Sequence, residues 1–323
     1  MRAVHVHRLD GPEALALVEV PEPEAGHDRV VVDVHAAGVA WPDLLMTYGR
    51  YQLRPEPPFA PGTEVAGTVR TAPPGSGLEP GTAVAVVTGA GGWQDTVVAR
   101  PEEVLRLPDG LPLLAAAGVP FNLLTVQFAL RRRARLQPGE TVLVHGASGG
   151  VGAAGLQLAR AYGARTIAVV SAPDKEATAR EAGADEVVLA DGFLARVREL
   201  TGGRGVDVVL DPVGGDRFTD SLRSLAVEGR LLVVGFTGGD IPTVKVNRLL
   251  LSNTSVVGVG WGAFLAGSPG HLQEQWAEVA GLLSEGRVRP VPGPVYDLAD
   301  ARMALEDMQA RRLRGKAVLA LRP

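Results

Sequence analysis

The sequence predicts an α/β protein in which a doubly wound parallel sheet is joined to a second, β-rich domain. Three observations carry this prediction. The first is a glycine-rich turn, within Val142–Gly152, that lies between an apolar run and a helical stretch. The second is the alternation of short apolar runs with helical segments after that turn. The third is the β-rich composition of residues 1–121, which differs from that of the centre of the chain.

The first part of the chain contains short β-branched and apolar runs separated by turns rich in Pro and Gly. Strands of this length and spacing are typical of a compact all-β or barrel-like domain. One helix is expected over Asp43–Tyr48, because Trp41-Pro42 or Asp43 makes a favourable helix start. The expected strands are Val4–Val6, Val30–His35, Thr63–Arg70, Ala83–Val87 and Thr96–Ala99.

Leu113–Leu130 is the most apolar stretch of the whole chain, and the central part begins after it. Pro120, Asn122 and Gln127 interrupt that stretch, so we expect buried connecting segments and no membrane span. Strands then alternate with helices of about ten residues, which predicts a parallel sheet covered on both faces. The expected strands are Thr141–Val144, Thr166–Val170, Glu186–Leu189, Val206–Leu210 and Leu231–Val234. The expected helices are Ala153–Tyr162, Asp174–Ala182, Phe193–Leu200 and Asp216–Leu225.

The last part of the chain predicts a strand over Ser255–Val259, helices over Leu272–Ser284 and Leu298–Arg311, and a closing strand over Ala317–Leu321. Periodicity alone leaves two arrangements open for these residues. They can cap the parallel sheet or return to the first domain.

The glycine-rich turn is the strongest functional signal. Gly146, Gly149 and Gly152 are spaced three apart, a close variant of the dinucleotide-binding fingerprint. Glycine lets a pyrophosphate approach main-chain N–H groups at a helix N-terminus, where the helix dipole favours negative charge. The turn also matches G-x-S-x-G formally, and Ser148 with a later Asp and His would suggest a hydrolase. The additional glycines favour the nucleotide interpretation.

The second predicted strand indicates which nucleotide is bound. An acidic residue about 20 positions after the glycines is typical of NAD binding. Here Ser171 lies 171 − 152 = 19 positions after Gly152, and Lys175 follows in the same loop. A hydroxyl and an ammonium group favour a 2′-phosphate, so NADP(H) is predicted over NAD(H). In the alternative interpretation, Asp174 is the ribose ligand and Lys175 is only solvated.

Composition excludes several other classes of function. The chain is 46% hydrophobic and 21% charged with a formal net charge of −4, which gives no reason to expect nucleic acid or an anionic membrane as partner. It has no cysteine, which excludes disulfides and thiolate chemistry. Its six histidines lack metal-ligand spacing, so no metal site is expected. No leader is recognised, and a cytoplasmic location is the expectation.

Eight short motifs are distributed along the chain. They are Ala37-Gly-Val-Ala-Trp-Pro-Asp43, Gly49-Arg-Tyr51, Pro61-Gly-Thr-Glu-Val-Ala-Gly67, Leu136-Gln-Pro-Gly139, His145-Gly-Ala-Ser-Gly-Gly-Val-Gly152, Gly183-Ala-Asp185, Asp211-Pro-Val-Gly-Gly215 and Gly229-Arg-Leu-Leu-Val-Val-Gly235. In these motifs, and over essentially its whole length, the sequence resembles the zinc-lacking quinone oxidoreductase (zeta-crystallin-like) family of the medium-chain dehydrogenase/reductase superfamily. The order and spacing of the motifs make the resemblance specific.

The resemblance implies a GroES-like catalytic domain made from residues 1–121 and 262–323, around a Rossmann dinucleotide-binding domain of residues 122–261, with the active site between them. It also implies a homodimer formed through Ser255–Val259. Members that use catalytic zinc carry a histidine and a cysteine where this chain has Thr63 and Ala40. The resemblance therefore implies a zinc-independent enzyme.

The resemblance further implies the roles of individual residues. Tyr51 is expected near the substrate, Thr125 at the nicotinamide end of the cofactor, and Arg311 at its 2′-phosphate with Ser171 and Lys175. Backbone groups of Gly235, Phe236 and Thr237 are expected to pass beside the nicotinamide. The pyrophosphate is expected on Gly146, Ala147, Ser148, Gly149, Gly150, Val151 and Gly152. Ala40 and Leu45 replace an asparagine and a tyrosine that are common in the family, which makes this pocket more apolar.

The function implied is NADPH-dependent hydride transfer to a small-molecule quinone or an α,β-unsaturated carbonyl, because an acceptor activated by conjugation needs no Lewis acid. One alternative is an enoyl-thioester (enoyl-CoA) reductase on the same scaffold. Another is an NADPH-binding protein that keeps the fold without turnover.

Overall fold

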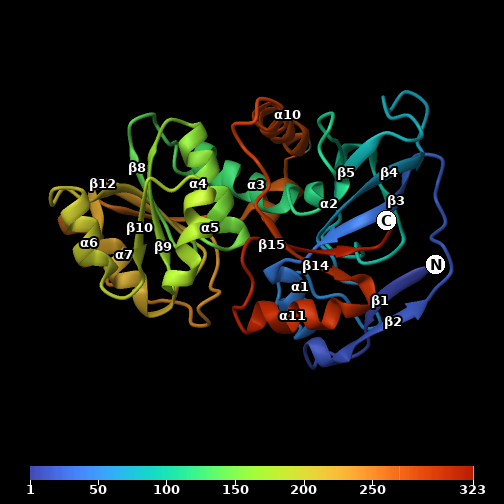
Figure 1. Cartoon of the computed structure of the whole chain (residues 1–323), viewed down its shortest axis with the longest axis horizontal. Helices are drawn as coiled ribbons and strands as arrows, with labels where there is room; N and C mark the ends of the chain where they lie inside the picture. The colour runs from blue at the N-terminus through green and yellow to red at the C-terminus, as the bar shows by residue number, and fades with distance from the viewer. Residues whose placement is uncertain (269, 323) are drawn as a thin grey trace. The chain divides into compact units, whose positions relative to one another are not determined.

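The computed structural model describes residues 1–268 and 270–322, and it divides the chain into two compact units. Unit 1 contains Met1–Phe121, Gly270–Ser284 and Pro292–Pro323, and unit 2 contains Asn122–Pro269 and Glu285–Val291. Both are drawn in Figure 1. The first boundary lies between Phe121 and Asn122.

The C-terminal part divides differently from the expectation that all of 262–323 would return to the first domain. Residues 262–268 and 285–291 belong to unit 2. In the second segment, the Arg289 N–H donates to Oε1 of Gln157 at 2.6 Å, and the Arg287 guanidinium donates to the carbonyl of Ala161. These hydrogen bonds attach the segment to a helix of unit 2, a contact that no local sequence pattern encodes.

Unit 2 is built on a six-stranded sheet with strand order β10-β9-β8-β11-β12-β13, in which every neighbouring pair is parallel. The strands are β8 (Thr141–Val144), β9 (Arg165–Val170), β10 (Glu186–Leu189), β11 (Val206–Asp211), β12 (Leu225–Val233) and β13 (Ser255–Gly258). All four residues of β8 are buried, as expected for a central strand covered on both faces. The predicted doubly wound sheet is confirmed.

Helices cover both faces of this sheet, with α4 packing beside α5 and α6 beside α7 (Figure 1). The helices of unit 2 are α4 (Gly150–Ala161), α5 (Glu176–Glu181), α6 (Phe193–Leu200), α7 (Phe218–Arg223), α8 (Asn247–Ser252) and α9 (Trp261–Ala266). Helix α3 (Pro120–Gln127) continues into a π-helical turn, Phe128–Arg133. One core cluster consists of Val, Leu, Ile and Phe side chains of the strands and of α6 and α7, and Leu156 and Leu158 of α4 are also fully buried.

One predicted helix of unit 2, Asp216–Leu225, is shorter in the structure. A 3₁₀ turn over Gly215–Arg217 leads into α7, and Leu225 already belongs to β12, where it pairs with Val206. The helix ends at Ser224, whose hydroxyl donates to the carbonyl of Ser221 at 2.7 Å. A side chain that bonds local backbone in this way competes with helix continuation.

Unit 1 is β-rich, as predicted, and strands from both ends of the chain share one sheet. The sheet has the order β14-β15-β3-β4-β5-β7, with β6 also paired to β3. Its strands are β3 (Val30–Gly38), β4 (Glu64–Thr71), β5 (Ala83–Val87), β6 (Thr96–Ala99), β7 (Val104–Arg106), β14 (Pro292–Asp297) and β15 (Lys316–Ala320). Strands β1 (Arg2–Val6) and β2 (Leu15–Glu19) form a separate antiparallel hairpin.

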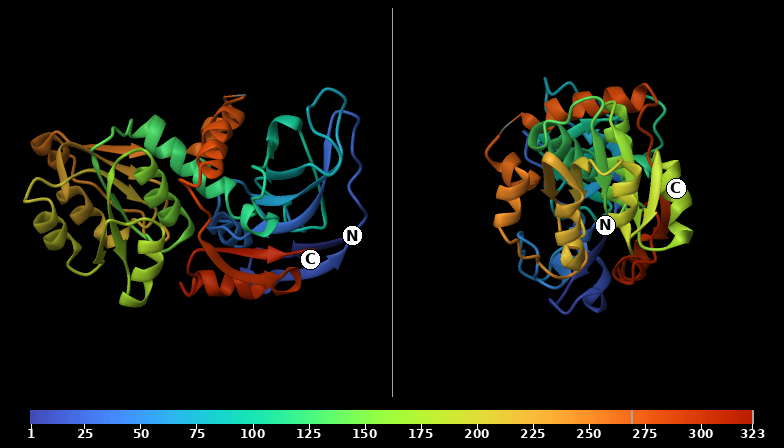
Figure 2. Two further views of the ribbon diagram at one scale, coloured as in Figure 1. Left: turned by 45° about the horizontal axis from the view of Figure 1, so that its top comes forward. Right: turned by 90° about the vertical axis from the view of Figure 1, so that its left-hand side faces the viewer.

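The C-terminal strand decides between the two arrangements that the sequence left open. β15 pairs antiparallel with β3, with Leu319 opposite Ala37. Figure 2 shows the red C-terminal strands in the same body as the blue N-terminal strands. The end of the chain therefore completes the first domain. The helices of unit 1 are α1 (Trp41–Thr47), α2 (Leu113–Ala116), α10 (His271–Ser284) and α11 (Ala301–Gln309).

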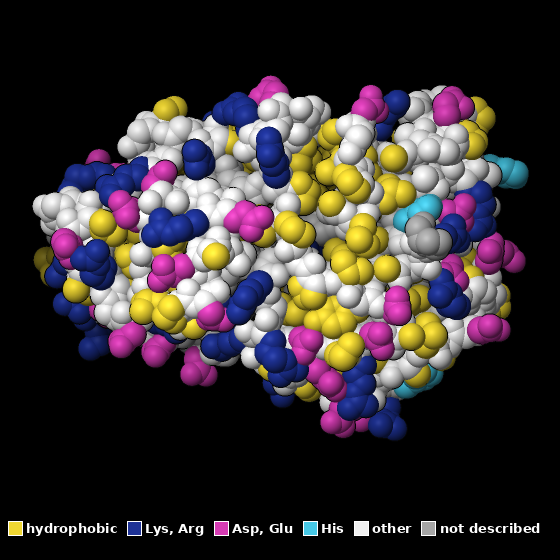
Figure 3. Space-filling model, viewed as in Figure 1, with side chains coloured by type: hydrophobic (Ala, Val, Ile, Leu, Met, Phe, Trp, Pro, Cys, Tyr) yellow, Lys and Arg dark blue, Asp and Glu magenta, His cyan; other side chains and the backbone are white. Residues whose placement is uncertain are grey.

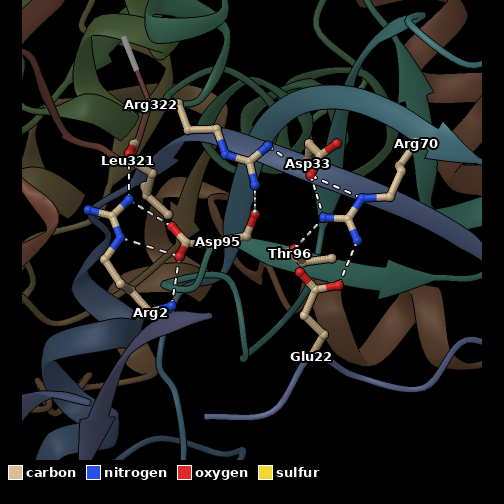
Figure 4. A network of polar contacts seen from close by, with 8 residues as sticks. All are labelled: Arg2, Glu22, Asp33, Arg70, Asp95, Thr96, Leu321 and Arg322. Carbon is tan, nitrogen blue, oxygen red and sulfur yellow. Dashed lines mark hydrogen bonds and ion pairs between the residues drawn. The ribbon is translucent and has the colours of Figure 1, made fainter. Parts of the chain in front are cut away.

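A network of arginines and carboxylates holds the two ends of the chain on unit 1 (Figure 4). The Arg2 guanidinium donates to Asp95 at 2.8 Å and to the Leu321 carbonyl at 2.7 Å. Arg322 pairs with Asp33 at 2.8 Å, and Arg70 shares that carboxylate at 2.6 Å. The Arg70 hydrogen bond is the main reason why the pKa of Asp33 is lowered.

Basic and acidic side chains are interspersed on the face of the molecule drawn in Figure 3. Within residues 1–268 and 270–322, no helix is long and apolar enough to span a membrane.

Candidate functional site

The glycine-rich turn lies at the carboxyl edge of the parallel sheet of unit 2. It follows β8, the strand at which the chain order reverses, with β9 on one side and β11 on the other. Ligands of open α/β sheets bind at this kind of switch point. The Ala147 N–H donates to the carbonyl of Val169 on the β9 side at 3.2 Å. On the β11 side, Gly146 packs against Val213, because a Cβ built on this glycine would lie 3.2 Å from the Val213 side chain.

The backbone of the turn requires glycine at two positions for different reasons. Gly146 has a φ of +59°, a conformation that side chains disfavour. At Gly152, a Cβ atom would lie 2.2 Å from the carbonyl oxygen of Gly146 and 2.6 Å from Cα of Ala147. The first turn of α4 therefore packs directly on the backbone that precedes it. This close approach leaves main-chain N–H groups at the helix start to face a ligand.

The segments after β11 and β12 extend the same edge. Asp211 accepts hydrogen bonds from the N–H groups of Val213 and Gly214 at 2.8 and 2.9 Å. The Thr237 N–H donates to the Pro212 carbonyl at 3.1 Å, and the Phe236 ring packs on Gly214. Gly235, Phe236 and Thr237 thus run beside the segment that contacts Gly146.

Ser171 and Lys175 are brought together after β9. Lys175 lies in a 3₁₀ turn, Pro173–Lys175, and its Nζ is 3.1 Å from Oγ of Ser171. Asp174, the alternative ribose ligand, belongs to the same turn. The phosphate ligands and the ribose ligand of the two interpretations therefore lie at the same end of β9. An ammonium group and a hydroxyl at this distance can bind one phosphate group together.

Two of the predicted site residues belong to unit 1. Tyr51 is half-buried, and its pKa is raised by burial and, to a smaller extent, by the charge of Asp43. Arg311 is exposed and has a φ of +58° directly after α11. Thr125 belongs to unit 2 and is buried on α3.

A buried polar cluster surrounds Thr63 in unit 1. Asp43 is fully buried, and its carboxylate accepts the N–H of Ala40 at 2.7 Å and that of Gly62 at 3.1 Å. The Thr63 hydroxyl has no hydrogen-bond partner within the described residues. Asp43 therefore fixes the backbone at Ala40 and at Gly62, the residue before Thr63.

Glu64, the residue after Thr63, forms a buried ion pair with Lys316. Lys316 Nζ lies 2.6 Å from Oε1 of Glu64, and these side chains are 10% and 0% exposed. The second carboxylate oxygen of Glu64 accepts the Phe121 N–H at 2.8 Å. The pair joins β15 to β4 and holds the last residue of the N-terminal segment of unit 1.

The burial of Asp43 makes the stability of the protein depend on pH. Burial raises the pKa of Asp43 from 3.8 to about 7, against the Ala40 hydrogen bond and the charge of Lys316. Because the pKa of Asp43 is higher in the folded protein than in the unfolded chain, the folded protein binds this proton more tightly. The stability that results is complete at low pH and is lost as pH rises through about 7. We expect the free energy of unfolding of wild type, relative to Asp43→Asn, to fall by roughly 4 kcal/mol between pH 4 and 8. Urea denaturation of both proteins at several pH values measures this difference, and a constant difference would contradict it.

The hydrolase interpretation needs Asp211 and His271 to act with Ser148, and His145 precedes Ser148 in the same turn. Nε2 of His145 is 2.8 Å from the Ser221 hydroxyl, and burial lowers the pKa of this histidine. The Asp211 carboxylate accepts its hydrogen bonds from two backbone N–H groups. His271 belongs to unit 1, where its Nδ1 lies 3.4 Å from Glu274. The structure gives the hydrolase interpretation no support.

Sequence reasoning missed several residues of these two regions. Asp43 was noted only as a helix start, and Glu64 only within a motif. Only one feature of the sequence could have indicated the Lys316–Glu64 pair, namely an isolated lysine at the start of an apolar strand. Gly155 was missed, although a Cβ there would lie 2.5 Å from Leu210 on β11, which makes it a second close helix–sheet contact. Within the described residues, no three His, Cys, Asp or Glu side chains are grouped to hold a metal ion.

Two family models match the chain. The alcohol dehydrogenase GroES-like domain matches residues 26–109, and the zinc-binding dehydrogenase domain matches residues 150–285. Their order is the same as that of the β-rich unit and the parallel sheet.

Full-length relatives are also found. The chain is 37% identical to quinone oxidoreductase-like protein 2 of Bos taurus, over 95% of this chain and 89% of the relative. It is similar in structure to a probable oxidoreductase from Mycobacterium abscessus, with 45% identity, a TM-score of 0.90 and 99% of each chain covered. It is also similar to the quinone oxidoreductase of Thermus thermophilus, solved alone and in complex with NADPH. That match has 36% identity and a TM-score of 0.87, and it covers 99% of this chain and 100% of the other.

Proposed function

Because this chain belongs to the quinone oxidoreductase family of the medium-chain dehydrogenase/reductases, we propose that it is an NADPH-dependent reductase of quinones or α,β-unsaturated carbonyls. The observation that carries the proposal is the glycine turn at the sheet's switch point, followed by the Ser171–Lys175 pair. A turn of this kind suits a pyrophosphate, and the pair suits an additional phosphate group.

The residues present fit NADP(H). Gly152 has no room for a Cβ atom beside Gly146 and Ala147. Such a close approach of helix and turn is typical of dinucleotide-binding sites. The main-chain N–H groups at the start of α4 would hold the pyrophosphate, and Ser171 and Lys175 would hold the 2′-phosphate. When bound, NADPH supplies the hydride. Thr125 and the backbone of Gly235, Phe236 and Thr237 would fix the orientation of the nicotinamide end, and Arg311 would add a charge for the 2′-phosphate.

The donor set around Thr63 supports a reaction that does not use zinc. Alanine at position 40 has no ligand atom, and Thr63 offers a hydroxyl in place of an imidazole. An acceptor already polarised by conjugation suits such a site. We propose that Tyr51 donates a hydrogen bond to the acceptor oxygen that gains charge, and that rate comes mainly from orientation and from this donor.

Lys175→Ala is expected to weaken NADPH binding by about tenfold and to leave NADH binding nearly unchanged, because a charge-assisted hydrogen bond to the 2′-phosphate is lost. Fluorescence titration with both nucleotides measures the two dissociation constants. Equal losses for NADPH and NADH would contradict the phosphate assignment and would favour Asp174 as the ribose ligand.

Tyr51→Phe is expected to lower kcat by roughly 10- to 100-fold with NADPH affinity unchanged, because the phenol acts only on the acceptor. Steady-state kinetics and NADPH titration of the same preparation separate the two effects. An unchanged kcat would remove Tyr51 from the mechanism.

The experiment that tests the proposed function is NADPH oxidation, followed by absorbance, with a panel of ortho- and para-quinones, enones and enoyl thioesters, and with NADH in parallel. Turnover of quinones or enones supports the proposal. Turnover of enoyl thioesters alone selects the enoyl-thioester reductase. Binding of NADPH without reduction of any acceptor selects the non-catalytic protein.

We also propose a homodimer formed through β13. This strand is at the edge of the sheet in unit 2, where its free backbone groups can pair with a second copy. Ile241, Val246, Leu250 and Leu251 of the same unit are each more than 70% exposed. Large apolar side chains at the surface support an interface. Light scattering of wild type and of Leu250→Glu/Leu251→Glu tests the proposal, and a monomeric wild type would contradict it.

A further inference from the structure

A buried asparagine faces the start of α4 in unit 2. Asn122 lies in the first turn of α3 and is 6% exposed. A Cβ built on Gly150 would lie 2.3 Å from its Nδ2 atom and 3.1 Å from its Cγ atom. The side-chain amide therefore lies directly against the first residue of α4.

The side chain of Asn122 forms no hydrogen bond within the part of the chain that the structure describes, and neither of its amide atoms is among the fully buried polar atoms without a partner. The amide is therefore open to solvent at this place, where a ligand that binds can replace water. An amide that supported α3 or α4 would be expected to bond their backbone. Asn122 contacts Gly150 without such a bond, so it is available to a group that binds at the helix start.

The chemistry of the surroundings indicates what this group is. The N-terminus of a twelve-residue helix carries partial positive charge and N–H groups without intrahelical acceptors. The atom of Asn122 that lies nearest to Gly150 is the Nδ2 donor. The side-chain donor thus lies beside the first residue of the helix, and this combination suits an anionic oxygen.

We propose that Asn122 is a cofactor-contacting residue whose side-chain amide donates a hydrogen bond to a pyrophosphate oxygen of NADP(H) at the start of α4. The inference rests on the proposed function. Thr125, three positions later and also buried, lies on the same side of α3. Asn122 and Thr125 then hold neighbouring parts of one cofactor, the pyrophosphate and the nicotinamide end.

The test is the affinity of wild type, Asn122→Ala and Asn122→Asp for NADPH and for NADH, measured by fluorescence titration. We expect Asn122→Ala to weaken both nucleotides by the same factor, about five- to tenfold, because both carry the pyrophosphate. Asn122→Asp should weaken both further, because a carboxylate of nearly the same shape repels the phosphates. The ratio of the two dissociation constants should stay at the wild-type value, in contrast to Lys175→Ala.

Gln127→Ala is the control, because Gln127 is another buried amide of α3 that lies roughly 140° around the helix from Asn122. It should leave both affinities unchanged. The melting temperature of each cofactor-free variant is measured alongside. If Asn122→Ala lowers only the melting temperature, or if Asn122→Asp binds as well as wild type, the inference is wrong. If wild type binds neither nucleotide, the proposed function itself fails.

Discussion

Gly152→Ala is expected to weaken NADPH binding by more than about 100-fold, because the start of α4 would shift away from the turn and the N–H groups that face the pyrophosphate would lose their positions. The added Cβ would lie 2.2 Å from the Gly146 carbonyl oxygen and 2.6 Å from Cα of Ala147, distances at which backbone has to move. Because both neighbours are main-chain atoms, no rotamer change relieves the clash.

Gly149→Ala is the matched control for this prediction. Gly149 is in the same turn, but its nearest neighbour would be 3.4 Å from the new Cβ, and its φ of −90° is allowed for alanine. Fluorescence titration with NADPH and circular dichroism are applied to both variants. We expect Gly149→Ala to bind within a few-fold of wild type. If Gly152→Ala folds and binds equally well, the close approach of helix and turn does not determine cofactor binding.

The contrast between these glycines shows how far the sequence could predict the turn. The spacing of Gly146, Gly149 and Gly152 predicted a nucleotide-binding turn after a strand, and the structure has that turn after β8. The spacing could not say which glycine is required for space and which for conformation. That distinction depends on how closely α4 approaches Gly146 and Ala147, which is a property of packing.

The strands were predicted well where they are buried on both faces, because a continuous apolar run has few alternatives. β8, of which all four residues are buried, has the predicted bounds. Strands β2, β7 and β14 were missed, and they are short or lie at an edge, where side chains alternate or stay exposed. Hydrophobic periodicity also could not predict that β15 pairs with β3, because strand pairing between distant segments leaves no local pattern in the sequence.

The candidate site was predicted unevenly for a similar reason. Ser171 and Lys175 are four positions apart, so their association could be read from the loop that contains them. Glu64 and Lys316 are 316 − 64 = 252 positions apart, and only the pairing of distant strands brings them together. Tyr51 and Thr125 came from the family resemblance alone, and their roles stay predictions.

Lys316→Met is expected to destabilise unit 1 by about 3–5 kcal/mol at neutral pH, the usual cost of removing one partner of a buried ion pair. Methionine keeps an apolar stem like that of Lys316, which packs against Gly118, so the loss comes mainly from the charge. Glu64 would keep the Phe121 N–H as a donor but would lose its counter-ion. Urea denaturation followed by tryptophan fluorescence reports mainly on unit 1, because Trp41, Trp93 and Trp276 belong to it and only Trp261 belongs to unit 2.

Two further variants separate the charge from the side chain. Lys245→Met makes the same substitution at an exposed lysine of unit 2 and should change the free energy of unfolding by less than about 0.5 kcal/mol. Glu64→Gln combined with Lys316→Met removes both charges and lets the amide oxygen accept the Phe121 N–H. The double variant should regain most of the lost stability, because a neutral pair of similar volume leaves no uncompensated charge in the core. Equal losses in the single and the double variant would mean that packing, and not the ion pair, joins β15 to β4.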